Sequence, residues 1–166
     1  MITLMNERLA EFSQSAELAS VDQWDSPLTH ELLRAPHRPP SSLPTGMCAV
    51  YIFSLSESYG ETCAAGPNRV LKVGKVGSNS APRFCSQHYL PNSANSNLAK
   101  SLLKDRVLWP YLGINELSEA NVKDWMLKNL DRDHIFVTKD SGLEREIEKF
   151  FGDISDRYLK DELVDF

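Results

Sequence analysis

Two short apolar segments separated by a polar loop constrain the fold more than any other feature of this sequence. Residues 48–55 are apolar and rich in β-branched and aromatic side chains, which is typical of a buried strand. Residues 70–77 form a second such segment, and Gly74 within it indicates close approach of a backbone or ligand. The loop of residues 56–69 is rich in Gly, Ser and Asn, which suits a hairpin connection. The sequence therefore predicts two neighbouring antiparallel strands.

Helical patterns surround one further predicted strand, at residues 134–138. Apolar residues at helical spacing predict helices from Arg83, over residues 96–108, over residues 118–130, and from about Ser141 onward. Consecutive strands joined by a hairpin loop, with helices around them, favour an α+β fold. We expect a small central antiparallel sheet of about three strands, flanked by helices.

A proline-rich stretch at residues 35–44 divides the chain into two parts. Its prolines exclude a helix or an interior strand, so it is predicted to be a linker or an extended strap. The first 34 residues are predicted to be helical, including a short segment at residues 28–33. We therefore expect a helical N-terminal extension with its strap over residues 1–45, and the main domain over residues 46–166.

Composition and termini favour a cytoplasmic protein without a membrane partner. No apolar run approaches the roughly 20 residues that span a bilayer. The N-terminus has neither the basic nor the apolar part of a secretory signal. The three cysteines show no zinc-ligand spacing, so reduced structural thiols are the prediction.

The distribution of charge is more informative than its sum. The chain has a formal net charge of −5, which argues mildly against nucleic-acid binding. Residues 69–106 nevertheless contain seven Lys or Arg residues and a single acid, Asp105. This segment could bind a phosphate polymer while the acidic remainder repels it. Basic side chains that merely solvate strand edges and helix faces are the alternative.

Four sequence elements occur in a characteristic order. Residues 49–51 (Ala-Val-Tyr) lie on the first predicted strand and residues 72–74 (Lys-Val-Gly) on the second. Arg83 begins the following helix, and residues 143–151 place glutamates on the final helix. This order and spacing resemble the GIY-YIG nuclease superfamily over about residues 46–160. The first tripeptide has alanine where the family has glycine, and the second has lysine where the family has tyrosine.

The resemblance implies an endonuclease, a hydrolase of phosphodiester bonds in DNA, acting in restriction, phage defence or a mobile element. It implies a divalent cation, Mg²⁺ or Mn²⁺, held by Glu146, with Glu144 as the alternative because helical geometry alone does not separate the two. Tyr51 would act as the general base or position the attacking water. Arg83 would contact the scissile phosphate, since a guanidinium binds phosphate bidentately.

Further residues could complete such a site. Lys72 would help Tyr51 lose its proton if the strand register puts both side chains on one face. His88 could carry a proton, or could be an ordinary helix-surface residue. The predicted backbone-phosphate contacts are Lys75, Lys100, Lys104 and Arg106. The implied partner is double-stranded DNA, and cleavage of both strands would call for a homodimer.

Two other functions remain open from the sequence. One is a catalytically weakened module that binds nucleic acid or a protein partner, favoured by the lysine at position 72 and the acidic total charge. The other is a small-molecule enzyme on an unrelated α+β fold, which would show a deep apolar pocket.

Overall fold

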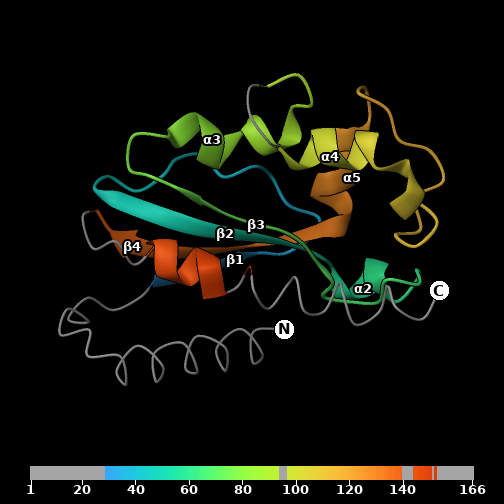
Figure 1. Ribbon diagram of the computed structural model, residues 1–166, viewed down its shortest axis with the longest axis horizontal. Coiled ribbons are helices and arrows are strands. Elements are labelled where there is room, and N and C mark those ends of the chain that lie inside the picture. Colours follow the sequence, from blue (N-terminus) through green and yellow to red (C-terminus); the bar gives the residue numbers. More distant parts are fainter. Residues whose placement is uncertain (1–28, 94–96, 140–143, 151, 153–166) are drawn as a thin grey trace.

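An antiparallel sheet of four strands forms the centre of the computed structural model, which describes residues 29–93, 97–139, 144–150 and 152 (Figure 1). The strands lie in the order β1-β4-β2-β3, and each neighbouring pair is antiparallel. Their bounds are Thr29–Leu33 for β1, Met47–Leu55 for β2, Val70–Val76 for β3 and Leu130–Thr138 for β4. Strands β2 and β4 are therefore central, and β1 and β3 form the edges.

Strand β2 is buried along its whole length after Met47. Its β-branched and aromatic side chains suit a strand that is paired on both sides and covered on both faces. Because side chains alternate along a strand, Tyr51 and Phe53 belong to one core cluster, whereas Val50 and Ile52 belong to the other.

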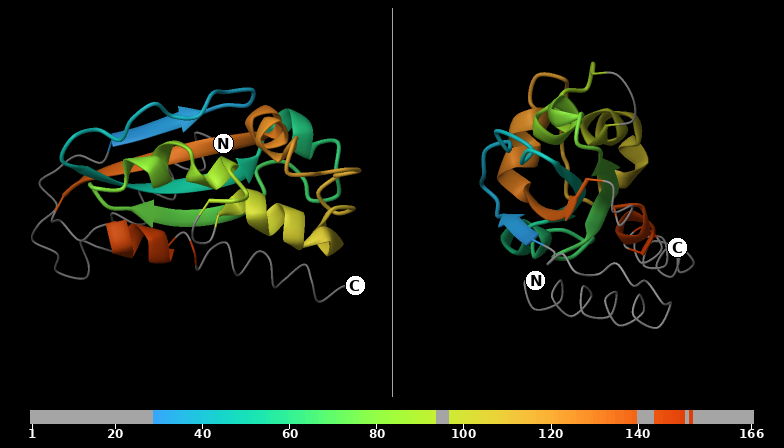
Figure 2. Two further views of the ribbon diagram at one scale, coloured as in Figure 1. Left: turned by 90° about the horizontal axis from the view of Figure 1, so that it is seen from above. Right: turned by 90° about the vertical axis from the view of Figure 1, so that its left-hand side faces the viewer.

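Helices cover the two faces of the sheet unequally (Figures 1 and 2). The larger core lies between the sheet and the layer that contains α3, α4 and α5, with Phe84 and Met126 among its buried residues. The smaller core lies on the opposite face, where residues 144–150 are helical and contribute buried Ile147. Both views in Figure 2 place this last helix alongside β3.

The helices are short, and side chains or proline define where several of them begin. Ser56 accepts a hydrogen bond at the start of α2, Asn97 accepts one at the start of α4, and Pro82 occupies the first turn of α3. The bounds are Glu57–Gly60 for α2, Ala81–Cys85 for α3, Leu98–Lys104 for α4 and Val122–Asn129 for α5. Two 3₁₀ turns are η1, Gln87–Tyr89, and η2, Arg106–Leu108.

The α+β class and the antiparallel sheet are confirmed, and so are the strands predicted at residues 48–55 and 70–77. The prediction of a helical segment at residues 28–33 is wrong for residues 29–33, which form edge strand β1. Pairing with β4 supplies backbone hydrogen bonds that outweigh a weak local helical pattern. The sheet consequently has four strands instead of three. The predicted helices before residue 29 and the predicted start at Ser141 lie outside the described residues.

Strand β4 begins at Leu130, four residues before the predicted start at residue 134. Polar residues at positions 131–134 conceal this part of the strand in the sequence, although all four are buried. Several of their polar atoms have hydrogen-bond partners on other elements. His30, for example, bonds to Asp133 at 2.7 Å between Nε2 and Oδ1. The predicted helix over residues 118–130 is correspondingly shorter and begins at Val122.

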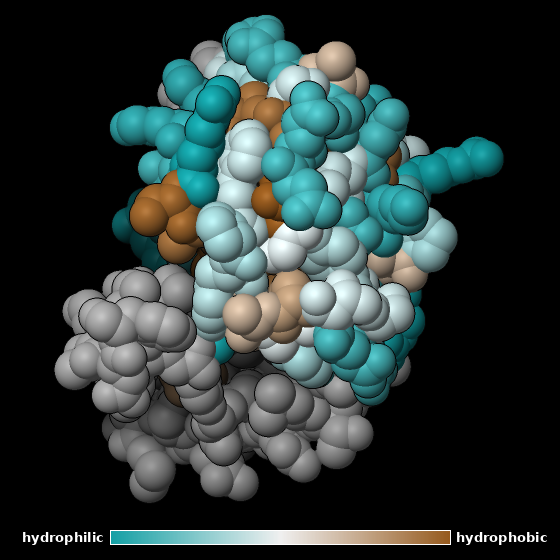
Figure 3. Space-filling model, turned by 90° about the vertical axis from the view of Figure 1, so that its right-hand side faces the viewer, coloured by the Kyte–Doolittle hydropathy of each residue, from teal (hydrophilic) through white to brown (hydrophobic). Residues whose placement is uncertain are grey.

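The described surface is mainly polar. Figure 3 views the side of the molecule that lies to the right in Figure 1, and hydrophilic residues cover most of its described part. The large apolar side chains exposed within the described ranges are Leu90, Val107 and Leu108. Among the described residues, no helix is both long enough and apolar enough to cross a membrane.

Candidate functional site

Tyr51 lies at the centre of the candidate site, on the sheet face covered by α3. It pairs with Gly74 on β3 and with His134 on β4, and none of its side chain is exposed to solvent. A Cβ atom built on Gly74 would overlap the Tyr51 hydroxyl. Glycine at this position therefore allows the phenol to lie directly over the backbone of β3 and to direct its oxygen toward that edge of the sheet.

Arg83 and His88 approach Tyr51 from the helical layer. The Arg83 Nη2 atom donates to the Tyr51 hydroxyl at 3.4 Å, and α3 brings it there directly after β3. The His88 ring lies 4.5 Å from the Tyr51 ring and 5.6 Å from the Phe53 ring, centroid to centroid. His88 is 1% exposed, and neither of its ring nitrogens has a hydrogen-bond partner among the described residues. The structure thus brings together three of the residues that the sequence singled out.

The strand register answers whether Lys72 and Tyr51 share a face. Lys72 pairs with Phe53, and Gly74 pairs with Tyr51, so Lys72 lies on the Tyr51 face one step along β3. Lys72 contributes to lowering the pKa of His88, which places its charge near that imidazole. The condition that the sequence left open is therefore met, and the lysine lies diagonally from the phenol.

The glutamates of the last helix occupy different environments. Glu146 is exposed, and Glu144 is half-buried with an Oε2 atom that has no described hydrogen-bond partner. Glu148, one turn beyond Glu144, bonds to Lys75 of β3 at 3.1 Å between Oε2 and Nζ. Its negative charge also contributes to raising the pKa of Tyr51. Glu148 is thus the acid whose charge acts on Tyr51, and the sequence did not single it out.

Burial is the main influence on the ionisation of Tyr51. It raises the pKa of the phenol above its ordinary value of 10.0, and this outweighs the Arg83 hydrogen bond and the charges of Arg83 and Arg132, which lower it. The cations near the hydroxyl would therefore stabilise a phenolate, but Tyr51 holds its proton at neutral pH. The sequence assigned the help of a cation to Lys72, whereas the charges that lower the pKa of Tyr51 are those of Arg83 and Arg132.

Arg132 of β4 lies fully buried beneath the same side chains, with no exposed area. Its Nη2 atom donates to the Phe84 carbonyl oxygen at 2.6 Å, and its Nη1 atom donates to the Tyr89 hydroxyl at 3.2 Å. Its guanidinium also lies within 6 Å of four aromatic rings, those of Tyr51, Phe53, Phe84 and Tyr89. In the sequence Arg132 stands between Asp131 and Asp133, a polar pattern that is typical of a surface segment and gave no sign of its burial.

Two buried histidines are held neutral. Burial, followed by the charge of Arg132, lowers the pKa of His88 to about 3 and that of His134 to about 2. Glu31 accepts a hydrogen bond from His134 Nδ1 at 3.0 Å, a contact that would favour a charged ring. Glu31 is half-exposed, however, so its attraction is screened and the cost of burying a charged imidazole prevails. His88 therefore enters any reaction near neutral pH as an uncharged imidazole.

The predicted phosphate contacts fall in two places. Lys75 lies on β3, where it is paired with Glu148. The others are exposed on the helical layer: Lys100 and Lys104 on α4, and Arg106 on η2. The Arg106 guanidinium lies over the Trp109 ring at 5.3 Å from its centroid. Helix α4 packs on the sheet face that holds Tyr51, whereas Lys75 pairs with Val50 and so lies on the opposite face, at the β3 edge.

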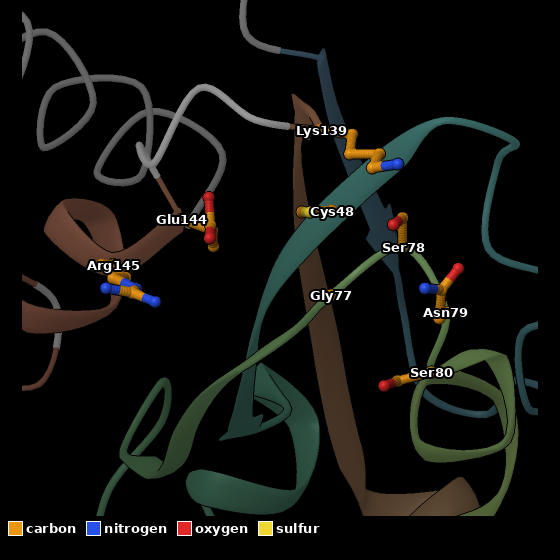
Figure 4. Close-up of a pocket in the computed structure, with 8 residues that line it drawn as sticks. All are labelled: Cys48, Gly77, Ser78, Asn79, Ser80, Lys139, Glu144 and Arg145. Carbon is orange, nitrogen blue, oxygen red and sulfur yellow. The ribbon is translucent and has the colours of Figure 1, made fainter.

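A polar pocket of about 420 Å³ lies at the end of the sheet where β3 leads into α3 (Figure 4). Figure 4 shows the loop side chains of residues 78–80 and Lys139 across from Glu144 and Arg145 of the last helix. Its lining is Cys48, Gly77, Ser78, Asn79, Ser80, Lys139, Glu144 and Arg145. The side chains around Tyr51 are not part of this lining. The pocket is therefore a neighbour of the candidate site and not its centre.

Replacing Gly74 by alanine is expected to displace the Tyr51 hydroxyl, because the added methyl group would occupy its position. Overpacking of this kind costs about 1–3 kcal/mol of unfolding free energy, which urea titration would measure. Gly77→Ala is the matched control, since a Cβ atom there has no neighbour within 4 Å. Equal effects of the two substitutions on stability would contradict the close packing of Tyr51 on β3.

The donor groups of the site limit how a metal could be held. Within the ranges that the structure describes, no three His, Cys, Asp or Glu side chains are grouped as metal ligands. A single carboxylate at the rim, such as Glu148, suits only a cation that takes its remaining ligands from water and substrate.

Compared with known proteins, the chain matches no family model, no curated protein and no solved structure.

Proposed function

We propose that this protein is a metal-dependent endonuclease that hydrolyses phosphodiester bonds in DNA. The observation that carries the proposal is the contact of Arg83 Nη2 with the Tyr51 hydroxyl at 3.4 Å, above a glycine that leaves room for it. The resemblance of the sequence to the GIY-YIG nuclease superfamily assigns these two residues to water activation and phosphate binding.

The chemistry follows from the groups that meet at the β3 edge. Arg83 would bind the scissile phosphate, where its fixed positive charge stabilises the negative charge that grows in the transition state. The Tyr51 oxygen would orient the attacking water. To act as the base, Tyr51 would first have to lose its own proton, a loss that the charges of Arg83 and Arg132 favour and that burial opposes. Lys72, on the same face, would add a second cation toward the phosphate.

Glu148 is the carboxylate that we assign to the cation, in place of Glu146. A carboxylate oxygen is a ligand that Mg²⁺ and Mn²⁺ prefer, and one such ligand suffices when water and substrate phosphate complete the shell. When bound, the cation would supply Lewis-acid stabilisation of the phosphate oxygens. Glu148 would exchange the Lys75 ammonium for the cation, and Lys75 would then be available to a neighbouring phosphate.

A DNA-binding module without activity is the second candidate, and one observation favours it. Tyr51 is completely buried, so water reaches its hydroxyl only if some of the groups that cover it move. A binding module needs no such movement, because it would use only the exposed basic residues of α4 and η2.

The test is nicking of supercoiled plasmid in Mg²⁺ or Mn²⁺ by wild type, Glu148→Gln and Glu146→Gln. We expect Glu148→Gln to lower the nicking rate by about 10²–10³-fold, because loss of the cation removes several kcal/mol of charge stabilisation. Glu146→Gln is the matched control on the same helix, and its exposed carboxylate predicts a rate within about twofold of wild type.

Each outcome assigns the site differently. If Glu148→Gln is fully active and Glu146→Gln loses activity, Glu146 is the metal ligand instead. No cutting by the wild type, together with a gel shift that weakens steeply as salt rises, would favour the binding module. Neither cutting nor binding would contradict both candidates.

A further inference from the structure

Arg132 is a buried cation without a described carboxylate partner. Its side chain is fully buried, and no ion pair links it to an acid within the described part of the chain. An arginine cannot shed its proton in a protein, so it carries its charge into the core. Burying a charge without an ionic partner costs several kcal/mol, and an apolar residue of the same volume would avoid that cost. The position of the charge therefore calls for a reason other than stability.

The contacts of Arg132 join three elements of the candidate site. From β4, one Nη atom donates to the Phe84 carbonyl oxygen, next to Arg83 in α3, and the other donates to the Tyr89 hydroxyl in η1. The Cζ atom of the guanidinium lies over the rings of Phe53 and Tyr51 in β2, at 4.9 and 5.5 Å from their centroids. A desolvated cation is attracted to the faces of aromatic rings, so these contacts help to hold the guanidinium in place.

We propose that Arg132 is a positioning residue of this site: its buried fork holds the Phe84 carbonyl and the Tyr89 hydroxyl so that Arg83 and Tyr51 keep their mutual geometry. The inference rests on the proposed function and deepens it. A displacement of about 1 Å in a reacting group can cost a hundredfold in rate, so a clamp one layer below the reacting groups matters to catalysis without touching substrate.

Arg132 is one of several charged or titratable groups around the Tyr51 phenol. The helical layer contributes Arg83 from α3, and His88 and Tyr89 from η1; strand β3 contributes Lys72, strand β4 contributes Arg132 and His134, and the last helix contributes Glu148. Of these, Arg132 contacts residues of β2, α3 and η1 at once. Replacing Arg132 is therefore expected to displace the side chains that it contacts on all three elements.

The experiment compares two substitutions. Arg132→Met replaces the charged side chain by an unbranched apolar one, and Arg132→Lys keeps the charge but loses the two Nη donors of the guanidinium. Protein labelled with 3-fluorotyrosine would be followed by ¹⁹F NMR at neutral pH, with the Tyr51 signal assigned through Tyr51→Phe. We expect the Tyr51 signal to move in both variants. We expect kcat for plasmid nicking to fall about tenfold to a hundredfold in Arg132→Met, KM to stay within about twofold, and Arg132→Lys to recover part of the loss.

The two readouts separate this inference from the proposed function. Urea titration identifies which variant is folded, and Arg132→Lys decides the outcome if Arg132→Met does not fold. An unmoved Tyr51 signal in a folded variant would overturn the inference, whatever happens to kcat, and so would unchanged kcat. If wild type cuts no DNA, the proposed function fails, and the ¹⁹F signal still decides whether Arg132 holds Tyr51 in place.

Discussion

Replacing Tyr51 by phenylalanine is expected to lower the rate of plasmid nicking by about 10²–10⁴-fold, the range for loss of a general base or of the group that orients water. The substitution removes one oxygen atom and leaves the ring in the core. In the described part of the chain, that oxygen makes one long contact, with Arg83 at 3.4 Å. Its loss is expected to change the free energy of unfolding by no more than about 1 kcal/mol. A large fall in rate with little change in stability is therefore the signature of a catalytic hydroxyl.

Tyr59→Phe is the matched control for this prediction. The Tyr59 hydroxyl donates to the carbonyl oxygens of Leu112 and Gly113, at 3.1 Å each, and it lies at α2 outside the candidate site. Its loss is expected to cost about 1 kcal/mol of stability, measured by urea titration, and to leave nicking unchanged. A Tyr51→Phe variant that cuts as fast as wild type would remove Tyr51 from the mechanism and leave it as a core residue.

Local patterns predicted the parts of the fold that local physics determines. Apolar, β-branched segments identified β2 and β3. Gly74 within β3 was expected to mark the approach of a backbone or a ligand, and the group that approaches it is instead the Tyr51 side chain. Because side chains alternate with a period of two, the common face of Tyr51 and Lys72 needed only the register of one strand pair. The sequence does not contain that register, since it depends on how the loop between β2 and β3 closes.

The elements that the sequence missed depend on distant partners. Strand β1 is short and polar in part. It forms a strand because it pairs with β4, which lies about a hundred residues later in the chain. The early part of β4 carries buried charges at positions 131–133, which a hydropathy pattern assigns to the surface. The same reason concealed Arg132, whose compensating contacts come from four aromatic rings on β2, α3 and η1.

The environments of the three glutamates show the same limit within one helix. Glu144 and Glu148 are one turn apart and share a side of the helix, whereas Glu146 points elsewhere and is exposed. The resemblance favoured Glu146, with Glu144 as the alternative. Contact of Glu148 with Lys75 depends on the docking of the helix beside β3, and that docking is set by Ile147 in the smaller core.

Acid is expected to unfold this protein readily because two core histidines resist protonation. The folded-state pKa is about 3 for His88 and about 2 for His134, against 6.5 for the ordinary side chain. Below pH 6.5 the unfolded chain therefore binds protons at both positions and the folded chain does not. Each histidine then lowers the free energy of unfolding by about 1.4 kcal/mol per pH unit, and the pair by about 3 kcal/mol per unit. Burial raises the pKa of Asp131, which opposes this slope in part.

Urea titrations between pH 7.5 and 4 would measure this slope, and His88→Phe provides the variant that tests its cause. Phenylalanine keeps a ring beside Tyr51 and removes two nitrogens that have no described hydrogen-bond partner, so stability at pH 7 is expected to hold or rise. The slope below pH 6 is expected to fall by about half, to about 1.4 kcal/mol per pH unit, because only His134 then contributes. A wild-type stability that stays level down to pH 4.5 would mean that the folded protein protonates these rings, and His88 would regain its place as a proton carrier near Tyr51.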